Sequence, residues 1–289
     1  MAALKEIKGR IASVQSTLKI TSAMKMVASA KLHRVQAQAQ ALARYEERLA
    51  AIAGALGGDP DLAVVSPLTA PHDKRERAVV AAFSSDGSLC GAFNANAARA
   101  LAEQTERLKA EGFERITVIP VGEKIAQAAR KAGYEIDERF RSLVGKASYE
   151  SAAALADALM EEYASGSADR VLLVYNHFHS MGRQIVRQER YLPMAVPEAA
   201  ENVPADRTVE YIYEPAAARL LEELLPYTLR TQLYSVLLDS RTAEHAARTV
   251  AMQTAADNAK ELLDELSLTY NKRRQQAITD ELADIAHPD

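Results

Sequence analysis

Residues 10–53 read RIASVQSTLKITSAMKMVASAKLHRVQAQAQALARYEERLAAIA and contain neither glycine nor proline. A second run of this kind spans residues 227–287. At about 1.5 Å of rise per residue, helices over the two runs would be roughly 65 and 90 Å long. A compact domain of this size has a radius of gyration of only about 19 Å, so such helices have to project from it. Because they lie at opposite ends of the chain, they can bury their apolar stripes mainly against each other.

From Leu4 to Ala53, the chain has a series of positions at alternating spacings of three and four. Twelve of fifteen such positions are apolar: Leu4, Ile7, Ile11, Val14, Leu18, Ala28, Leu32, Val35, Ala39, Leu42, Leu49 and Ala53. The exceptions are Thr21, Lys25 and Glu46. A seam with a period of 3.5 predicts a left-handed coiled coil. The interruption at Thr21 and Lys25 indicates a place where the helix faces something other than its partner helix.

Charge is distributed unevenly along the chain, although the net charge is only −4. Residues 1–58 hold nine Lys and Arg against three Asp and Glu, and residues 214–289 hold eight against thirteen. Opposite signs favour pairing of the two ends, although exposed ion pairs contribute only about 0.2–1 kcal/mol each. Solvated charged faces explain any single pair equally well. The acidic total argues against nucleic acid as the main partner.

The middle of the chain predicts a largely parallel open sheet, because apolar runs alternate with helical segments. Strands are expected at 77–83, 116–120, 171–175 and 184–191, and helices at 94–110, 123–131 and 149–164. Asn94 is the expected cap of the first of these helices. The last helix is expected to start within 215–225 and to run uninterrupted after Pro226. Its expected apolar stripe passes through Leu229, Leu233, Val236, Ala243, Ala247 and Val250. Beyond Val250 the stripe is expected to shift, as packing against changing neighbours would require, and to continue through Ala259, Leu263, Leu266 and Tyr270.

The predicted fold is therefore α/β: a long antiparallel coiled coil of the N- and C-terminal helices plus a Rossmann-like open-sheet domain. The predicted organisation is a shaft helix over 1–58, a linker over 59–75, an α/β base domain over 76–192, a linker over 193–214 and a second shaft helix over 215–289.

No pattern for catalysis stands out. Neither a P-loop nor a G-x-G-x-x-G motif occurs, so no nucleotide or other cofactor is predicted. Cys90, the single cysteine, would need a base such as His177 or His179, and a small buried cysteine is the more common case. The His177-Phe-His179 pair is too small a ligand set to predict zinc. Met24 and Met26 suit either an adaptable partner surface or ordinary core packing.

Two terminal stretches resemble one known family, the gamma subunit of F-type ATP synthases. The first stretch comprises Leu4-Lys-Glu-Ile-Lys-Gly-Arg-Ile-Ala-Ser-Val-Gln15 and Ile20-Thr-Ser-Ala-Met-Lys-Met-Val-Ala28. The second comprises Ala256-Asp-Asn-Ala-Lys260, Tyr270-Asn-Lys-Arg-Arg-Gln275 and Ala277-Ile-Thr-Asp-Glu281. Leu89-Cys-Gly91 matches a short motif of the family's middle domain.

The resemblance implies a central rotor shaft without a catalytic site of its own, which couples ion-driven rotation of the membrane ring to ATP synthesis on the beta subunits. The implied partners are the hexamer of alpha and beta subunits, the epsilon subunit and the membrane c-ring. The expected location is the cytoplasmic face of a bacterial cell membrane, peripheral and without direct insertion. The alternatives are a coiled-coil structural scaffold and a small α/β enzyme that uses Cys90.

The resemblance also implies positions for individual residues. Met24, Lys25, Met26 and Arg248 would lie near the lower mobile domains of the beta subunits. Arg274, Gln275 and Thr279 would make polar contacts with beta-subunit loops in the upper cavity. Ile278, Leu282 and Ile285 would form an apolar tip. The loop Asp86-Gly-Ser-Leu-Cys-Gly91 stands where the family has Asp-Arg-Gly-Leu-Cys-Gly, so an arginine is absent.

Overall fold

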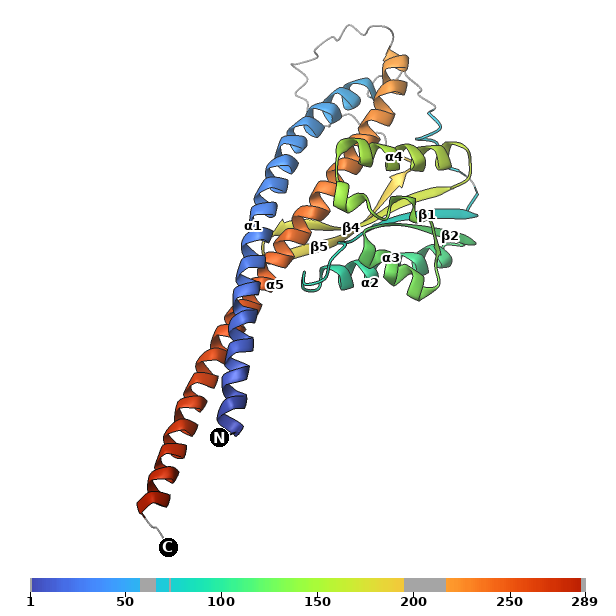
Figure 1. Ribbon diagram of the computed structural model, residues 1–289. Coiled ribbons are helices and arrows are strands. Elements are labelled where there is room, and N and C mark those ends of the chain that lie inside the picture. Colours follow the sequence, from blue (N-terminus) through green and yellow to red (C-terminus); the bar gives the residue numbers. More distant parts are fainter. Residues whose placement is uncertain (1, 58–65, 73, 195–216, 287–289) are drawn as a thin grey trace.

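Two long helices run antiparallel and an α/β domain packs beside their upper half (Figure 1). The computed structural model describes residues 2–57, 66–72, 74–194 and 217–286. Helix α1 spans Ala2–Gly57 and helix α5 spans Ala217–Ala286. The start of α1 and the end of α5 lie at the lower end of the shaft, where α5 extends beyond the start of α1 (Figure 1). The predicted combination of an antiparallel coiled coil and an open-sheet domain is confirmed.

The predicted seam of α1 is confirmed from Leu4 to Leu49, because every seam position in this range is buried or half-buried. Ala28, Leu32 and Val35 are the most deeply buried apolar residues of this seam. Glu46 keeps its place in the seam because its carboxylate accepts a hydrogen bond of 2.9 Å from the Ser235 hydroxyl on α5. Burial raises the pKa of Glu46, while this hydrogen bond opposes that shift. The side chain of Ala53 lies outside the described residues.

The seam is interrupted at Thr21 and Lys25, where the sequence indicated a neighbour other than the partner helix, yet both side chains remain covered. Thr21 is buried, and its hydroxyl donates to the backbone carbonyls of Thr17 at 3.0 Å and Leu18 at 3.1 Å. A threonine can occupy an apolar seam in this way because its own helix satisfies its hydroxyl. Lys25 stays half-buried, and the residues that turn outward are Met24 and Met26.

The described strands form a five-stranded sheet in the order β3-β2-β1-β4-β5. The strands are β1 (Arg77–Phe83), β2 (Arg115–Val121), β3 (Glu135–Ile136), β4 (Arg170–Ser180) and β5 (Arg183–Leu192). All neighbouring pairs are parallel except β4 and β5, which form an antiparallel hairpin. The helices are α2 (Phe93–Ala110), α3 (Glu123–Ala132) and α4 (Tyr149–Ala164), with short 3₁₀ turns at Glu138–Phe140 and Leu143–Lys146.

The sheet is covered on both faces, as a buried parallel sheet requires. Ala78, Val80 and Ala82 of β1 point to the side of α2 and α3. Val79 and Phe83 point to the opposite side, into a core shared with α4 and α5. Strand alternation therefore divides β1 between two cores, and one of them is built partly from the shaft.

Helix α5 changes character along its length. From Leu229 to Thr249 almost every residue is buried or half-buried, since this part lies between α1 and the α/β domain. Beyond this part a single stripe remains covered, through Met252, Ala256 and Ala259. Val250 was expected in the stripe, but it is exposed because the covered face has rotated to Met252 as the α/β domain ends.

One local expectation was wrong. Asn94 does not cap α2, whose cap position is Ala92. Its amide group instead binds the loop before the helix. Helix α5 begins at Ala217 and runs through Pro226, in agreement with the expected start of the last helix within 215–225. A proline inside a helix removes one backbone hydrogen bond and crowds the carbonyl four residues earlier, and packing of α5 against the rest of the fold offsets this cost.

The seam gives a direct prediction about stability. Replacing Leu32, which is 3% exposed, with alanine should lower the free energy of unfolding by about 3 kcal/mol, because it leaves a cavity between α1 and α5. Met26→Ala on the same helix is the control. Met26 is 68% exposed, so its loss should change stability by no more than about 0.5 kcal/mol. Urea denaturation followed by helical circular dichroism measures both, and equal effects would contradict the assigned seam.

Candidate functional site

The surface predicted around Met24 forms one wall of a groove of about 510 Å³. Helix α1 contributes Met24, Val27 and Lys31 to it, and α5 contributes His245 and Arg248. The third wall is the loop that follows β1, through Gly87, Ser88 and Leu89. The structure thus brings together residues from three distant parts of the sequence.

The loop is held in place by Asn94. The Asn94 side chain accepts from the Ser85 N–H at 3.1 Å and donates to the Gly87 carbonyl at 3.2 Å and to the Cys90 sulfur at 3.1 Å. With its base fixed in this way, the loop presents Leu89 in a left-handed backbone conformation with φ of 66° and an exposed side chain. A non-glycine residue in this region is uncommon and marks a conformation that the surrounding structure imposes.

Arg248 connects the loop to the shaft. Its guanidinium forms an ion pair with Glu244 one turn earlier on α5 and donates to the Ser88 carbonyl at 3.3 Å. Only 16% of its side chain is exposed. Arg248 was predicted to contact a beta subunit, and the structure shows in addition that it binds within its own chain.

The other predicted contact residues lie on the surface. Met24 and Met26 are exposed and Lys25 is half-buried. Arg274, Gln275 and Thr279 are exposed on α5, where the Thr279 hydroxyl donates to the Gln275 carbonyl at 3.0 Å.

Of the predicted apolar tip, Ile278 and Leu282 are exposed, and the side chain of Ile285 lies outside the described residues. These tip residues and the three polar ones lie between residue 274 and the end of α5, and that end of the helix extends past the start of α1 (Figure 1).

His245 is the site residue that the sequence did not reveal. It is 5% exposed, and neither ring nitrogen has a hydrogen-bond partner among the described residues. Burial, together with the nearby charges of Arg241, Arg248 and Lys31, lowers the pKa of His245 to about 4. The imidazole is therefore neutral at physiological pH. No motif surrounds His245, and its neighbours on α1 and the loop are visible only in the fold.

The residues that the alternative enzyme hypothesis requires do not form a common site. Cys90 is buried in a small cluster with Phe93 and with Ala243 and Ala247 of α5. His177 lies 2.6 Å from Asp239 of α5, through Nδ1. His179 is exposed. Within residues 2–57, 66–72, 74–194 and 217–286, no three His, Cys, Asp or Glu side chains gather as a metal site.

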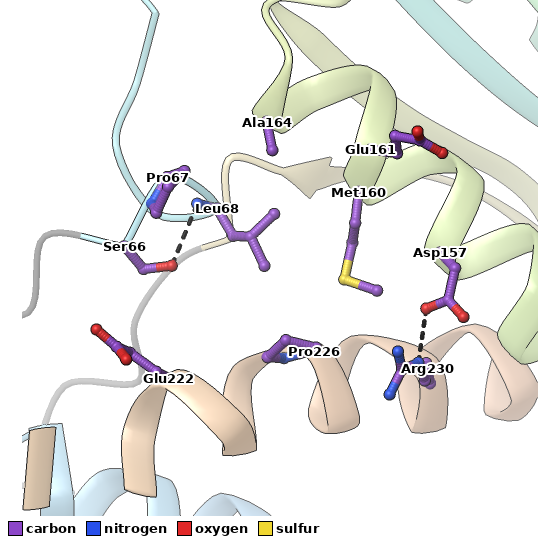
Figure 2. Close-up of a pocket in the computed structure, with 10 residues that line it drawn as sticks. All are labelled: Ser66, Pro67, Leu68, Asp157, Met160, Glu161, Ala164, Glu222, Pro226 and Arg230. Carbon is purple, nitrogen blue, oxygen red and sulfur yellow. Dashed lines mark hydrogen bonds and ion pairs between the residues drawn. The ribbon is translucent and has the colours of Figure 1, made fainter. Parts of the chain in front are cut away.

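A second cavity of about 500 Å³ lies between α4, α5 and the segment that leads to β1 (Figure 2). Leu68, Met160 and Pro226 give it an apolar interior. At one side Asp157 accepts a hydrogen bond of 2.6 Å from Arg230, so this acid and base already neutralise each other. The cavity contains none of the residues predicted to contact partners.

The arrangement defines a shaft protein, since two long helices pack against a doubly wound base and the exposed residues that were predicted to contact partners lie along the helices. The protein belongs to the ATP synthase gamma chain family, because residues 3–287 match the family model described as ATP synthase and full-length relatives carry that name. The prediction from the two terminal motifs is thereby confirmed, and the family gives the chain a non-catalytic role as the shaft subunit of an ATP synthase.

The relatives match over nearly the whole chain. The ATP synthase gamma chain of Phocaeicola vulgatus is 46% identical over 286 residues, which are 99% of this chain and 98% of the relative. That of Bacteroides fragilis is 47% identical, with the same coverage of both chains. That of Chlorobaculum tepidum is 40% identical, covering 99% of this chain and 97% of the relative.

Solved structures share the fold at low identity. A chain of the Euglena gracilis mitochondrial ATP synthase rotor superimposes with a TM-score of 0.60 at 17% identity, covering 96% of this chain and 99% of its own length. A chain from the OSCP/F1/c-ring structure of the same enzyme gives a TM-score of 0.63 at 18% identity, covering 99% and 93%.

The neutral state of His245 predicts a pH dependence. The unfolded chain protonates this residue near pH 6.5, whereas the folded chain does so near pH 4, so the unfolded state binds more protons between these values. The resulting stability is present above about pH 6.5 and is lost as the pH falls toward 4.

Between pH 7.5 and pH 5, wild type should therefore lose about 2 kcal/mol more stability than His245→Gln. Urea unfolding at both pH values measures this difference, with His33→Gln on the exposed side of α1 as the control. Equal losses in wild type and His245→Gln would show that the imidazole is not held neutral.

Proposed function

We propose that the shaft acts on the beta subunits of its ATP synthase through two separate surfaces. The lower surface consists of Met24, Lys25, Met26 and Arg248, beside the base domain. The upper surface consists of Arg274, Gln275, Thr279 and the tip residues Ile278, Leu282 and Ile285. The other partners are the alpha subunits, the epsilon subunit and the c-ring.

One observation carries the lower surface. The seam of α1 is already covered by α5, yet Ile20, Met24, Met26 and Val27 expose large apolar side chains within two turns. A concentration of exposed apolar side chains on a folded chain marks a surface that another protein covers. Methionine suits a surface whose partner changes shape, because its unbranched side chain adapts to different neighbours.

The upper surface is supported by the position of the end of α5. Past the start of α1 no second helix of the described chain packs against it (Figure 1). Single helices are marginal in water, so this end needs surrounding protein to remain ordered. Arg274 and Gln275 can offer directional hydrogen bonds there, while an apolar tip can turn in a sleeve because it makes few directional bonds.

The mechanism follows from asymmetry. A single shaft presents different faces to the three beta subunits, and each face shifts the equilibrium between open and closed conformations only by its differential contact with the two. Rotation of the shaft by a third of a turn exchanges these roles. The base domain would transmit torque from the c-ring and contact epsilon.

We place the assembly at the cytoplasmic face of a bacterial membrane, with this chain as a peripheral subunit. In the part of the chain that the structure describes, no helix is both long and apolar enough to span a bilayer. Attachment would therefore come through its partner subunits.

The test is reconstitution with alpha, beta and epsilon subunits and then with the membrane sector. Arg274→Ala combined with Gln275→Ala should lower coupled ATP synthesis roughly tenfold, because a hydrogen bond to a charged group contributes about 1.5 kcal/mol. Lys260→Ala combined with Glu261→Ala, exposed on the same helix and neutral in net charge, should leave the rate unchanged.

If the Arg274 and Gln275 double variant assembles normally and synthesises ATP at the wild-type rate, the proposed contact of the upper surface with the beta subunits would be wrong. Recovery of the tagged wild-type chain from solubilised membranes tests the whole proposal. Alpha, beta and epsilon subunits with ATPase activity are expected in the eluate. A homodimer without these partners would instead favour the scaffold.

A further inference from the structure

The groove between α1, the loop 87–89 and α5 has the features of a small-molecule site. Its volume of about 510 Å³ lies within the range of about 300–1,000 Å³ typical of ligand pockets. Its deepest polar group is His245, which is 5% exposed. Both ring nitrogens of His245 lack a hydrogen-bond partner among the described residues. A buried polar group without a partner is costly, so a ligand that supplies one gains affinity there.

The charges around His245 select the sign of that ligand. Lys31 on α1 and Arg248 on α5 line the groove, and Arg241 lies close enough to disfavour a positive charge on the imidazole. Glu244 is the acid beside them, and its carboxylate is already paired with Arg248. The groove therefore carries excess positive charge, which an anion would compensate.

The remaining walls are apolar. Met24, Val27 and Leu89 expose large side chains around the opening, and Ala23 and Ala28 complete the α1 wall. A multiply charged anion such as phosphate would lose much of its hydration against these walls. A ligand with a single negative charge on an aliphatic chain fits both the positively charged part of the groove around His245 and its apolar walls.

We propose that this groove binds an amphiphilic monocarboxylate of the fatty-acid type. Its carboxylate lies near Lys31 and Arg248, and it accepts a hydrogen bond from the His245 ring N–H after displacing the side chains that cover this nitrogen. Its aliphatic chain packs against Met24, Val27 and Leu89. The binding step is independent of the role proposed for the shaft.

The location gives such a ligand a consequence that does rest on the proposed function. Met24 belongs to the surface assigned to the beta subunits, so a bound carboxylate would occupy space that the rotating shaft needs. Binding would then slow rotation as a brake, without contact with a nucleotide site.

Calorimetric titration of the full chain with octanoate tests the binding. Saturable binding is expected, and acetate, which lacks the chain, and octylamine, which has the opposite charge, should bind at least about tenfold more weakly. Lys31→Gln removes a cation from the exposed part of α1 and should weaken octanoate several-fold. Lys19→Gln, also exposed on α1, is the matched control and should bind octanoate as wild type does.

His245→Leu should weaken octanoate at least about tenfold, provided that circular dichroism shows an unchanged fold. If this variant does not fold, the affinity of Lys31→Gln for octanoate and the comparison of octanoate with acetate and octylamine still test the proposal. Failure of octanoate to saturate would overturn the proposal, as would equal binding of octylamine. Unchanged affinity in both Lys31→Gln and a folded His245→Leu would place the ligand elsewhere and overturn it as well.

The brake is tested separately in the assembled complex. Octanoate should inhibit ATP hydrolysis by the wild-type complex and inhibit the Lys31→Gln complex less. If octanoate binds but does not inhibit ATP hydrolysis, the binding site stands and only the proposed effect on rotation is wrong. If the chain does not assemble with alpha and beta subunits, the proposed function is contradicted, whereas the proposed binding of octanoate is not.

Discussion

The fold depends on the burial of the middle of α5 on all sides. Leu229, Leu233 and Leu237 belong to the core of the α/β domain, although they lie on a shaft helix. Full burial of each such side chain contributes about 1.5–3 kcal/mol. The base domain cannot turn relative to the shaft without exposing this shared core. Rotation applied to the base is therefore transmitted to the shaft by packing, and no covalent or metal link is required.

From this shared core the shaft becomes progressively less supported. Beyond Thr249 only one stripe of α5 is covered, and past the start of α1 the described side chains are mostly exposed. Few buried contacts mean low local stability. The stiff part of the shaft thus lies beside the base, whereas the projecting end takes its order from whatever surrounds it. This division agrees with the two kinds of surface, an adaptable apolar one around Met24 and a directional polar one around Arg274.

The sequence predicted those features that depend on periodicity. The seam of α1 was predicted position by position, since a spacing of 3.5 is a local property of the chain. The buried strands were predicted because parallel strands covered on both faces read as continuous apolar runs. Val250 was misplaced because the face of α5 that is covered changes where the α/β domain ends. That end is set by tertiary structure, which the helix period alone does not encode.

The candidate site was predicted only in part, for a related reason. Met24 and Met26 belong to a recognisable motif; their spacing alone suited a core as well as a surface, and the structure shows both exposed. His245 belongs to no motif, and its significance arises from Lys31 and Leu89, which are far from it in sequence. Asn94 was taken for a helix cap because asparagine is common at that position, but the fold uses its side chain to hold the loop.

The loop that carries Leu89 shows how the base and the shaft constrain each other. Arg248 donates to the Ser88 carbonyl, and its Nη2 atom would lie 3.7 Å from a Cβ atom added at Gly87. The gamma-subunit motif that this loop resembles has an arginine at position 87. An arginine there would bring a second guanidinium close to Arg248, and like charges at short range repel. With glycine at this position, Arg248 binds both Glu244 and the loop without a competing cation. The departure from the motif is therefore consistent with a loop to which Arg248 makes the polar contact from α5, beside the apolar contact of Cys90 with Ala243 and Ala247.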